Sequence, residues 1–378
     1  MPRRAPTLAG FVALGLFWGA WAAVLPSVQR ATNASKAGLG VALFFVAVGS
    51  LPAMLLIAGP AVDRFGSRAV ALACLAFAGA TTLPGLATSL PVLALTLVAA
   101  GAGSGALDVG INANVARIES STGSRLMPLA HGLYSVGILV GAVGAGIARS
   151  QGAGREEILA AIAVLVALTA LPLEADPAAS NGPLQADGRR PPRARFGFER
   201  ALVALGLLGA AAFVVEGGTE GWSALFLERQ LHAHPAVSGL GPGVFGGAMA
   251  IGRFYGQAVR RSDRTLLAGG ALLACAGCAL AAAAPSSAVA LIGFAAAGAG
   301  ISLNAPIVFA LAGRDRDHAA SSVATVTTIG YLGLLIGPPL VGGVGQLVTL
   351  RGSFVLLAAI AAAVAAAAIR LRRLWFDL

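Results

Sequence analysis

Ala99-Ala100-Gly101-Ala102-Gly103 is a glycine-rich pentapeptide that recurs 197 residues later as Ala296-Ala297-Gly298-Ala299-Gly300. Three further matches keep this offset: Gly59-x-Ala61-Val62-x-Arg64 with Gly256-x-Ala258-Val259-x-Arg261, Arg117 with Arg314, and Tyr134 with Tyr331. One match in a chain rich in Gly and Ala carries little weight, but four separated matches in one register indicate an internal duplication. The repeat predicts two halves of the same fold.

The composition places these halves in a membrane. Of the 378 residues, 57% are hydrophobic and only 11% are charged, and the mean hydropathy is +0.83. A water-soluble domain carries about 25% charged residues. A soluble enzyme and a secreted disulfide scaffold are therefore disfavoured, and the three cysteines all lie in apolar runs. The net charge of +10 is scattered over short loops without interleaved aromatic residues, which argues against nucleic acid as a partner.

Twelve apolar segments reach the roughly 20 residues that a spanning helix needs, or come close to it. The predicted helices are 8–28, 38–62, 69–88, 91–115, 128–148, 157–173, 201–222, 237–259, 265–284, 287–312, 319–346 and 353–371. We therefore expect an all-α membrane protein with 12 transmembrane helices.

The chain divides into two six-helix bundles, residues 1–173 and 201–378, joined by a linker at 174–200 that is polar and rich in Pro and Arg. An offset of six helices makes the halves parallel repeats, related by an axis along the membrane normal. Carriers built in this way bind solute near the midplane between the repeats and expose it to each side in turn. Transport is therefore the leading hypothesis.

The distribution of Lys and Arg predicts the orientation. If the N-terminus is cytoplasmic, 19 basic residues lie on the cytoplasmic side and 6 on the other side, with Arg253 inside a helix. This excess predicts that both termini and the linker are cytoplasmic. The excess of Arg and Ala is typical of a GC-rich genome, so we expect a bacterial inner membrane.

A charged motif closes the second helix, Gly59-Pro60-Ala61-Val62-Asp63-Arg64-Phe65-Gly66-Ser67-Arg68. We expect Gly59 to permit a close helix approach and Gly66 to allow a tight turn. Asp63, with Arg64 and Arg68, is suited to a charged latch that holds the halves together on one side. The motif resembles the GxxxDRxGxR signature of the major facilitator superfamily, which implies that Asp63 braces the inner gate. An ordinary solvated loop is the alternative interpretation, and the second half has Arg260 where Asp63 maps.

Two further segments, Gly105-Ala106-Leu107-Asp108-Val109-Gly110-Ile111-Asn112-Ala113-Asn114 and Met127-Pro128-Leu129-Ala130-His131-Gly132-Leu133-Tyr134-Ser135, look like helix 4 and helix 5 motifs of the MosC/YbjJ-like branch of the superfamily. This resemblance implies a secondary transporter of small polar solutes, with rhizopine-type inositol derivatives or sugars as candidate cargo.

Ionisable residues inside the apolar segments are the candidate site, because a charge near the bilayer centre costs about 2.5 to 3.5 kcal/mol even on insertion scales. Asp108 and Asn112 are four residues apart and share a helix face, where they suit proton uptake or hydrogen bonds to hydroxyls and amines. On the next helix, His131 and Tyr134 are spaced to line one face, and His titrates near neutral pH. A loop-anchoring role is the alternative for His131.

The second half contributes fewer candidates. Glu216 and Arg253 are expected inside helices, and Arg253 is a possible partner for Asp108 across the halves. Glu220 is expected at the outer interface, in water. Asn304 and Tyr331 are polar residues that either contact solute or pair with neighbouring helices. Trp21, with Trp18 and Trp222, either stacks on a sugar-like ring or anchors the membrane interface.

We therefore expect a transporter of a small polar solute, sugar- or inositol-like, that is coupled to protons, with Asp108 alternating between protonated and ionised forms. An exporter of drugs or amphipathic compounds ranks second, because aromatic residues make up only 6% of the chain. A non-transporting receptor is the other alternative. Enzyme motifs and a Walker A sequence are absent, so neither catalysis nor ATP drive is expected. We expect no cofactor, no metal, contacts with membrane lipids, and a monomer; cargo, direction and coupling ion stay open.

Overall fold

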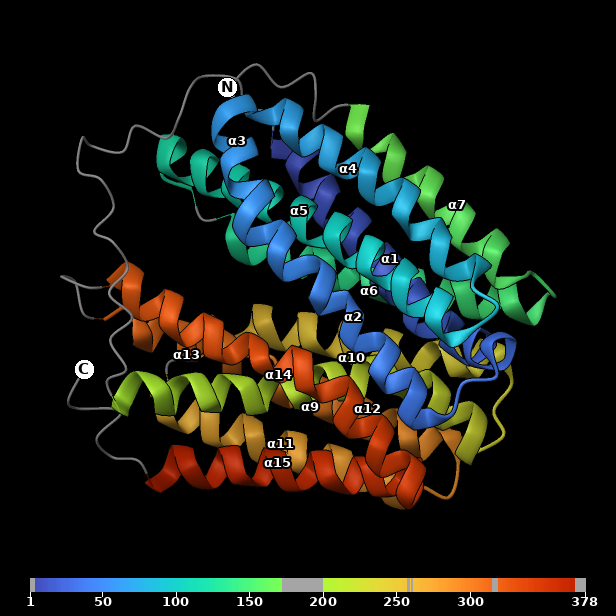
Figure 1. Cartoon of the computed structure of the whole chain (residues 1–378). Coiled ribbons are helices and arrows are strands. Elements are labelled where there is room, and N and C mark those ends of the chain that lie inside the picture. The colour runs from blue at the N-terminus through green and yellow to red at the C-terminus, as the bar shows by residue number, and fades with distance from the viewer. Residues whose placement is uncertain are drawn as a thin grey trace.

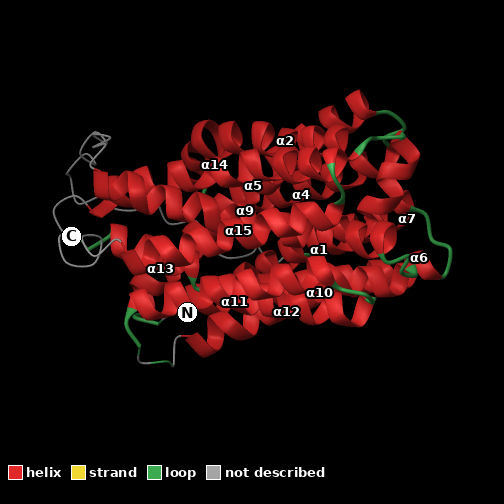
Figure 2. Cartoon of the chain, turned by 90° about the horizontal axis from the view of Figure 1, so that it is seen from below, coloured by secondary structure: helices red, strands yellow, loops and turns green. Residues whose placement is uncertain are grey.

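Helices make up the fold in the computed structural model of the chain, which describes residues 4–124, 126–171, 200–256, 259, 261–314 and 319–370. Figure 2 shows that every regular element of this part of the chain is helical. The predicted linker at 174–200 lies outside the described residues, apart from Arg200.

The first bundle contains the elements up to residue 171. They are α1 (Arg4–Thr32), α2 (Lys36–Pro52), the π-helical η1 (Ala53–Ala58), α3 (Gly59–Phe65), α4 (Ser67–Thr82), the short 3-10 helix η2 (Leu83–Leu86), α5 (Leu90–Thr122), α6 (Met127–Ser150) and α7 (Arg155–Leu168). Because α2, η1 and α3 follow one another without a turn, they form one crossing.

The second bundle begins at residue 200. It contains α9 (Arg200–Gln230), α10 (Pro235–Gly256), α11 (Asp263–Ala283), α12 (Ser287–Ile301), α13 (Asn304–Ala312), α14 (Ala319–Leu347) and α15 (Leu350–Arg370). With α12 and α13 counted as one crossing, the prediction of twelve helices is confirmed. In the described part of the chain, ten of them are long and apolar enough to cross a membrane.

Two predicted helices end about two turns too early. The helix predicted at 91–115 continues as α5 to Thr122, because polar residues extend it until Gly123 takes a left-handed conformation with φ of +66°. The helix predicted at 201–222 continues as α9 to Gln230, because the apolar run Ala224 to Leu227 is buried against neighbouring helices.

Figure 1 shows the two bundles side by side, the first in blue to green and the second in yellow to red. Arg4, Arg200 and Arg370 begin or end helices at one end of the molecule, which we call the terminal end. The turn from α1 to α2 lies at the opposite end, which we call the far end. The ribbons of the bundles converge at the far end and diverge toward the terminal end (Figure 1).

Two helix pairs make the most extensive contacts between the bundles. In the first pair, α6 and α10 contact each other along most of their lengths, from Gly146 beside Gly239 to Gly132 beside Phe254. In the second pair, α2 and α14 meet near the far end, where Gly40 lies against the backbone of Pro338. Glycine at these places lets the backbones approach closely.

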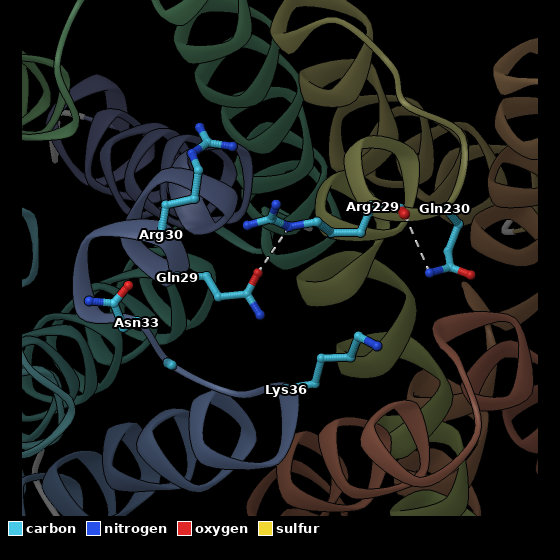
Figure 3. Close-up of a pocket in the computed structure, with 7 residues that line it drawn as sticks. Gln29, Arg30, Asn33, Lys36, Arg229 and Gln230 are labelled. Atoms are coloured by element: carbon cyan, nitrogen blue, oxygen red, sulfur yellow. Dashed lines mark hydrogen bonds between the residues drawn. The ribbon is translucent and has the colours of Figure 1, made fainter.

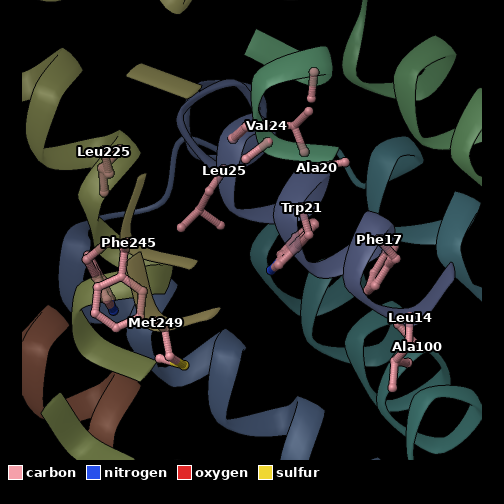
Figure 4. Packing of buried hydrophobic residues seen from close by; sticks show 14 of the residues in the cluster. Leu14, Phe17, Ala20, Trp21, Val24, Leu25, Ala100, Leu225, Phe245 and Met249 are labelled. Carbon is pink, nitrogen blue, oxygen red and sulfur yellow. The ribbon is translucent and has the colours of Figure 1, made fainter. Parts of the chain in front are cut away.

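An apolar core that includes residues of both bundles surrounds these contacts. Phe17 and Trp21 of α1 pack in one cluster with Ala100 of α5, Phe245 of α10 and Leu225 of α9 (Figure 4). Large apolar side chains also cover the outside of the molecule, among them Leu55 at 75% and Leu95 at 71% exposure. Such an apolar outer surface fits contact with lipid, since the helices satisfy their own backbone groups.

The repeated pentapeptide has the same packing role in both halves. A Cβ atom on Gly101 would lie 2.0 Å from the carbonyl oxygen of Val46 on α2, and one on Gly298 would lie 2.3 Å from that of Phe245 on α10. Only glycine permits these two close approaches. The duplication seen in the sequence is therefore also a duplication of helix contacts.

We predict that Gly101→Ala destabilises the protein by about 1 to 3 kcal/mol, because the added methyl group forces α5 away from α2. The measurement is the thermal unfolding temperature in detergent at a fixed scan rate. Gly144→Ala is the matched control, since no atom lies within 4 Å of its Cβ position. Equal unfolding temperatures for the two variants would contradict the predicted packing.

Candidate functional site

A carboxylate and an amide share one face of α5, as predicted. The Nδ2 group of Asn112 donates to Oδ1 of Asp108 at 3.0 Å and to the backbone oxygen of Asp108 at 2.8 Å. Both side chains are partly exposed rather than buried in the core. A neutral amide therefore contacts the Asp108 carboxylate, and this pair keeps further oxygen atoms able to accept hydrogen bonds.

Arg253 of α10 makes two contacts within the second bundle and one contact to the first bundle. Its Nη2 lies 3.5 Å from Oε1 of Glu216 on α9, and the side chains of this ion pair are 16% and 20% exposed. Its Nη1 donates to Oγ of Ser135 on α6 at 3.5 Å, which crosses between the bundles. The suggested pairing of Arg253 with Asp108 is wrong here, because Glu216 on the adjacent helix takes that position.

The third contact of Arg253 uses a break in the backbone of a neighbouring helix. Its Nε donates to the carbonyl oxygen of Ser302 at 3.5 Å. Ser302 follows the last residue of α12, and α13 begins at Asn304, so this carbonyl lies at a helix end, where oxygen atoms lack helical partners. At the corresponding place in the first half, α5 continues unbroken through Asp108.

Two tyrosines lie near the charged groups of both bundles, Asp108 in the first and the Glu216–Arg253 pair in the second. The charge of Asp108 acts electrostatically on both Tyr134 of α6 and Tyr331 of α14. Tyr134 also lies within electrostatic range of Glu216, Glu220 and Arg253. Helices of both bundles thus contribute to one group of polar side chains, which we call the central cluster: Asp108, Asn112, Tyr134, Ser135, Glu216, Glu220, Arg253 and Tyr331.

His131 lies at the edge of the central cluster, four residues into α6. Its ring packs against Phe11 with the ring centres 5.4 Å apart, and the charge of Arg253 acts on it. Its backbone oxygen accepts a hydrogen bond from Oγ of Ser135 at 3.2 Å.

Glu220 belongs to the central cluster, and the prediction that it lies at the outer interface is wrong. The continuation of α9 to Gln230 places Glu220 roughly 15 Å from the far end of this helix. Trp222 is likewise fully buried rather than at a membrane interface. The early helix end assumed from the sequence caused both errors.

Two candidate residues lie apart from the contacts that define this cluster. Trp21 is 4% exposed and stacks on Phe17 in the core of the first bundle. Asn304 is 1% exposed, and within the described residues neither atom of its side-chain amide has a hydrogen-bond partner. In this conformation, both residues are closed off from solvent.

The charged motif lies at the terminal end, between α3 and α4. Gly66 makes the predicted tight turn with φ of +57°, and its N–H donates to the carbonyl of Val62 at 2.9 Å. The predicted close approach at Gly59 is wrong, since its Cβ position has no atom within 4 Å. Arg64 and Arg68 are exposed, and Arg64 lies over the ring of Phe65. The side chain of Asp63 lies outside the described residues.

A buried ion pair at the far end was not predicted. Nη1 of Arg149 on α6 lies 2.6 Å from Oε1 of Glu228 on α9, with the two side chains 3% and 8% exposed. Arg30 of α1 contacts the other carboxylate oxygen at 3.1 Å, and Ser238 of α10 donates to Oε1 at 2.7 Å. Two helices from each bundle therefore meet at one carboxylate, which we call the far-end latch.

Further contacts hold Arg149 in the far-end latch. Its Nη1 donates to the backbone oxygen of Ala23 at 2.7 Å, and its Nε donates to Oγ of Ser27 at 3.0 Å. In the sequence, Arg149 and Glu228 look like ordinary charges near helix ends. One sequence feature could have indicated the latch, namely the apolar run that continues past Trp222. Because this run extends α9, Glu228 lies on the helix at the interface between the bundles.

The chain matches a known family over most of its length. The sequence model described as Major Facilitator Superfamily matches residues 7–338. An uncharacterised MFS-type transporter of Yersinia pestis is 34% identical over 374 residues, which cover 96% of this chain and 93% of that protein. Membrane protein MosC of Rhizobium meliloti is 31% identical over 360 residues, which cover 94% of this chain and 86% of that protein.

Solved structures share the fold at lower identity. The nucleoside transporter NupG superposes with a TM-score of 0.75 at 13% identity, covering 96% of this chain and 97% of that one. The fucose:proton symporter FucP of Escherichia coli superposes with a TM-score of 0.63 at 18% identity, covering 97% of each chain.

We predict that Arg149→Met loosens the far end, because it removes one partner of a buried ion pair, a change that costs about 3 to 5 kcal/mol. The readout is the labelling rate by a membrane-impermeant maleimide of a cysteine placed at Leu25, which is 1% exposed and points toward Phe245 (Figure 4). Cys74, Cys275 and Cys278 are first replaced by Ala. Labelling should be at least about tenfold faster in Arg149→Met.

The matched control for this prediction is Arg155→Met. The pair of Arg155 with Glu156 is wider, at 4.0 Å, and its side chains are 21% and 49% exposed, so the loss of this pair should cost at most about 1 kcal/mol. The far-end latch has no holding role if Arg149→Met and Arg155→Met are labelled at the same rate.

Proposed function

The chain belongs to the Major Facilitator Superfamily, and we propose that it is a proton-coupled secondary transporter that carries a small polar solute, sugar- or inositol-like, by alternating access. It is a multi-pass membrane protein, and its relative in Yersinia pestis is named as a transporter. We propose the bacterial inner membrane as its location and a monomer as its working unit, with membrane lipids around the two bundles.

The observation that carries the proposal is the position of Arg253. Its guanidinium reaches Glu216 and Ser302 in its own half and Ser135 in the other half. An ionisable residue inside a transmembrane segment is costly and marks a solute or ion pathway by default. A contact that crosses between the bundles must also break or re-form when the bundles rock against each other.

The same geometry supports an assignment of sidedness. With the terminal end in the cytoplasm, as the 19 to 6 distribution of basic residues favours, the far end faces outward. The far-end latch then closes the outer side. The conformation with converging bundles at the far end is therefore an inward-facing state under this proposal.

The central cluster favours a hydroxylated solute over an amphipathic one. It offers carboxylates, an amide, phenol and serine hydroxyls and a guanidinium, which are donors and acceptors suited to a ring that carries several hydroxyl groups. Tyr331 of the cluster packs against Phe213, with the ring centres 6.0 Å apart. FucP and NupG, which share the fold, are named for fucose with protons and for nucleosides.

The different partners of the two acids support the proposed proton coupling. Asp108 contacts a neutral amide, so it takes up a proton without breaking an ion pair. Glu216 is paired with Arg253, so a proton on Glu216 would weaken the bond that holds Arg253 in the second bundle. We propose that Asp108 takes up and releases the transported proton, and that Glu216 relays its effect to the contact between the bundles.

We predict that Asp108→Asn abolishes the dependence of transport on a pH gradient, because the amide cannot take up the proton. The protein is reconstituted in liposomes, and solute uptake is measured with and without the gradient. Glu156→Gln, which alters an exposed carboxylate on α7, serves as the control and should behave as wild type. A gradient dependence that is unchanged in Asp108→Asn would remove Asp108 from the coupling role.

The solute class is tested first by stability and then by exchange. We predict that an inositol, a sugar or an amino sugar raises the unfolding temperature of the purified protein, whereas hydrophobic cations do not, because binding to the folded state alone stabilises it. The stabilising compound is then labelled and used in counterflow from vesicles. Exchange indicates a carrier, and binding without exchange indicates a receptor.

A further inference from the structure

A basic depression opens at the far end, about 520 Å³ in volume, and it is separate from the central cluster. Gln29, Arg30, Asn33 and Ala34 from the end of α1 and the following turn line it, together with Lys36 of α2 and Arg229 and Gln230 of α9 (Figure 3). Three of these residues are cationic, and none carries a carboxylate. The lining therefore combines positive charge with amide hydrogen-bond donors.

The cations of this depression are only partly compensated. Arg30 contacts Glu228, whose carboxylate is shared with Arg149 and Ser238. Nζ of Lys36 donates to the backbone oxygen of Gly345 at 3.0 Å, near the end of α14. The side chain of Arg229 makes one hydrogen bond among the described residues, from its Nε to Oε1 of Gln29 at 3.2 Å (Figure 3). The N–H donors on its two Nη atoms stay available to a ligand.

The turn between α1 and α2, which lines one side of the depression, is fixed by backbone and capping hydrogen bonds. Asn33 takes a left-handed conformation with φ of +49°, and the N–H of Ala34 donates to the backbone oxygen of Gln29 at 3.2 Å. Ser35 caps α2 by accepting from the N–H of Gly38 at 3.0 Å. This short turn fixes the spacing between Arg30 and Lys36 before any anion binds, which lowers the cost of ordering the site.

We propose that this depression binds a multivalent oxyanion, such as a phosphate or a carboxylate-bearing solute. Guanidinium and amide N–H groups suit such oxygen atoms, and hydrogen bonds to charged groups are the strong ones. The lining comes from α1 and α2 in one bundle and from α9 in the other. The site is therefore complete only while the far end is closed, so an anion in it stabilises this conformation over one in which the far end opens.

The test measures binding of inorganic phosphate to the full chain in neutral detergent, by calorimetry and by the unfolding temperature, at constant ionic strength with chloride as the reference. Phosphate should bind and stabilise, and chloride at the same ionic strength should not. Arg229→Gln should raise the Kd for phosphate about tenfold or more, since it removes a charged hydrogen-bond partner. Arg155→Gln, a far-end arginine outside the depression, should leave the Kd unchanged.

Two further arms make the result specific. In nanodiscs of neutral lipid, the Kd for phosphate should equal the Kd in detergent. If nanodiscs of anionic lipid suppress phosphate binding and neutral ones do not, a lipid headgroup phosphate fills the same site. Phosphate should also slow maleimide labelling of a cysteine at Leu25, because it favours the closed far end.

The proposal is overturned if phosphate fails to bind in both detergent and neutral nanodiscs, or if Arg229→Gln and Arg155→Gln change the Kd equally. Neither outcome bears on transport, because the Asp108→Asn experiment tests a different part of the molecule.

Discussion

A charged side chain inside a bilayer needs a partner or water, and this requirement organises the described part of the molecule. Arg253 resolves it by contacting Glu216, Ser135 and a carbonyl freed by a broken helix. Asp108 resolves it with an amide one turn away on its own helix. Both charged groups lie where the two bundles face each other, which is where the proposed solute would pass.

The fold was largely predictable from the sequence because its signals are long. Apolar runs of about 20 residues locate the helices within a turn in most places, and the 197-residue offset anticipates that Gly101 and Gly298 pack alike. Helix ends were harder to predict. A polar extension such as the one that ends at Gly123 continues the backbone pattern after the apolar signal has ended.

The site was predictable only in part, for a geometric reason. Asp108 and Asn112 lie on one helix, where a spacing of four residues sets their proximity. Contacts between helices depend on how each helix is rotated about its axis, and periodicity does not give this angle to the accuracy of a hydrogen bond. The pairing of Arg253 with Glu216, and that of Arg149 with Glu228, therefore emerged only from the structure.

The far-end latch has no counterpart in the sequence repeat: at the 197-residue offset, Glu228 maps onto Ala31 and Arg149 onto Gln346. Because the repeats are parallel, these two positions lie at the same end of the molecule as the latch. The buried charge pair therefore joins the bundles at the far end on one side of the repeat, and the equivalent positions at that end are uncharged. In the proposed alternating-access cycle, opening the far end must separate this buried pair, so cargo or a proton has to contribute binding energy that offsets its loss.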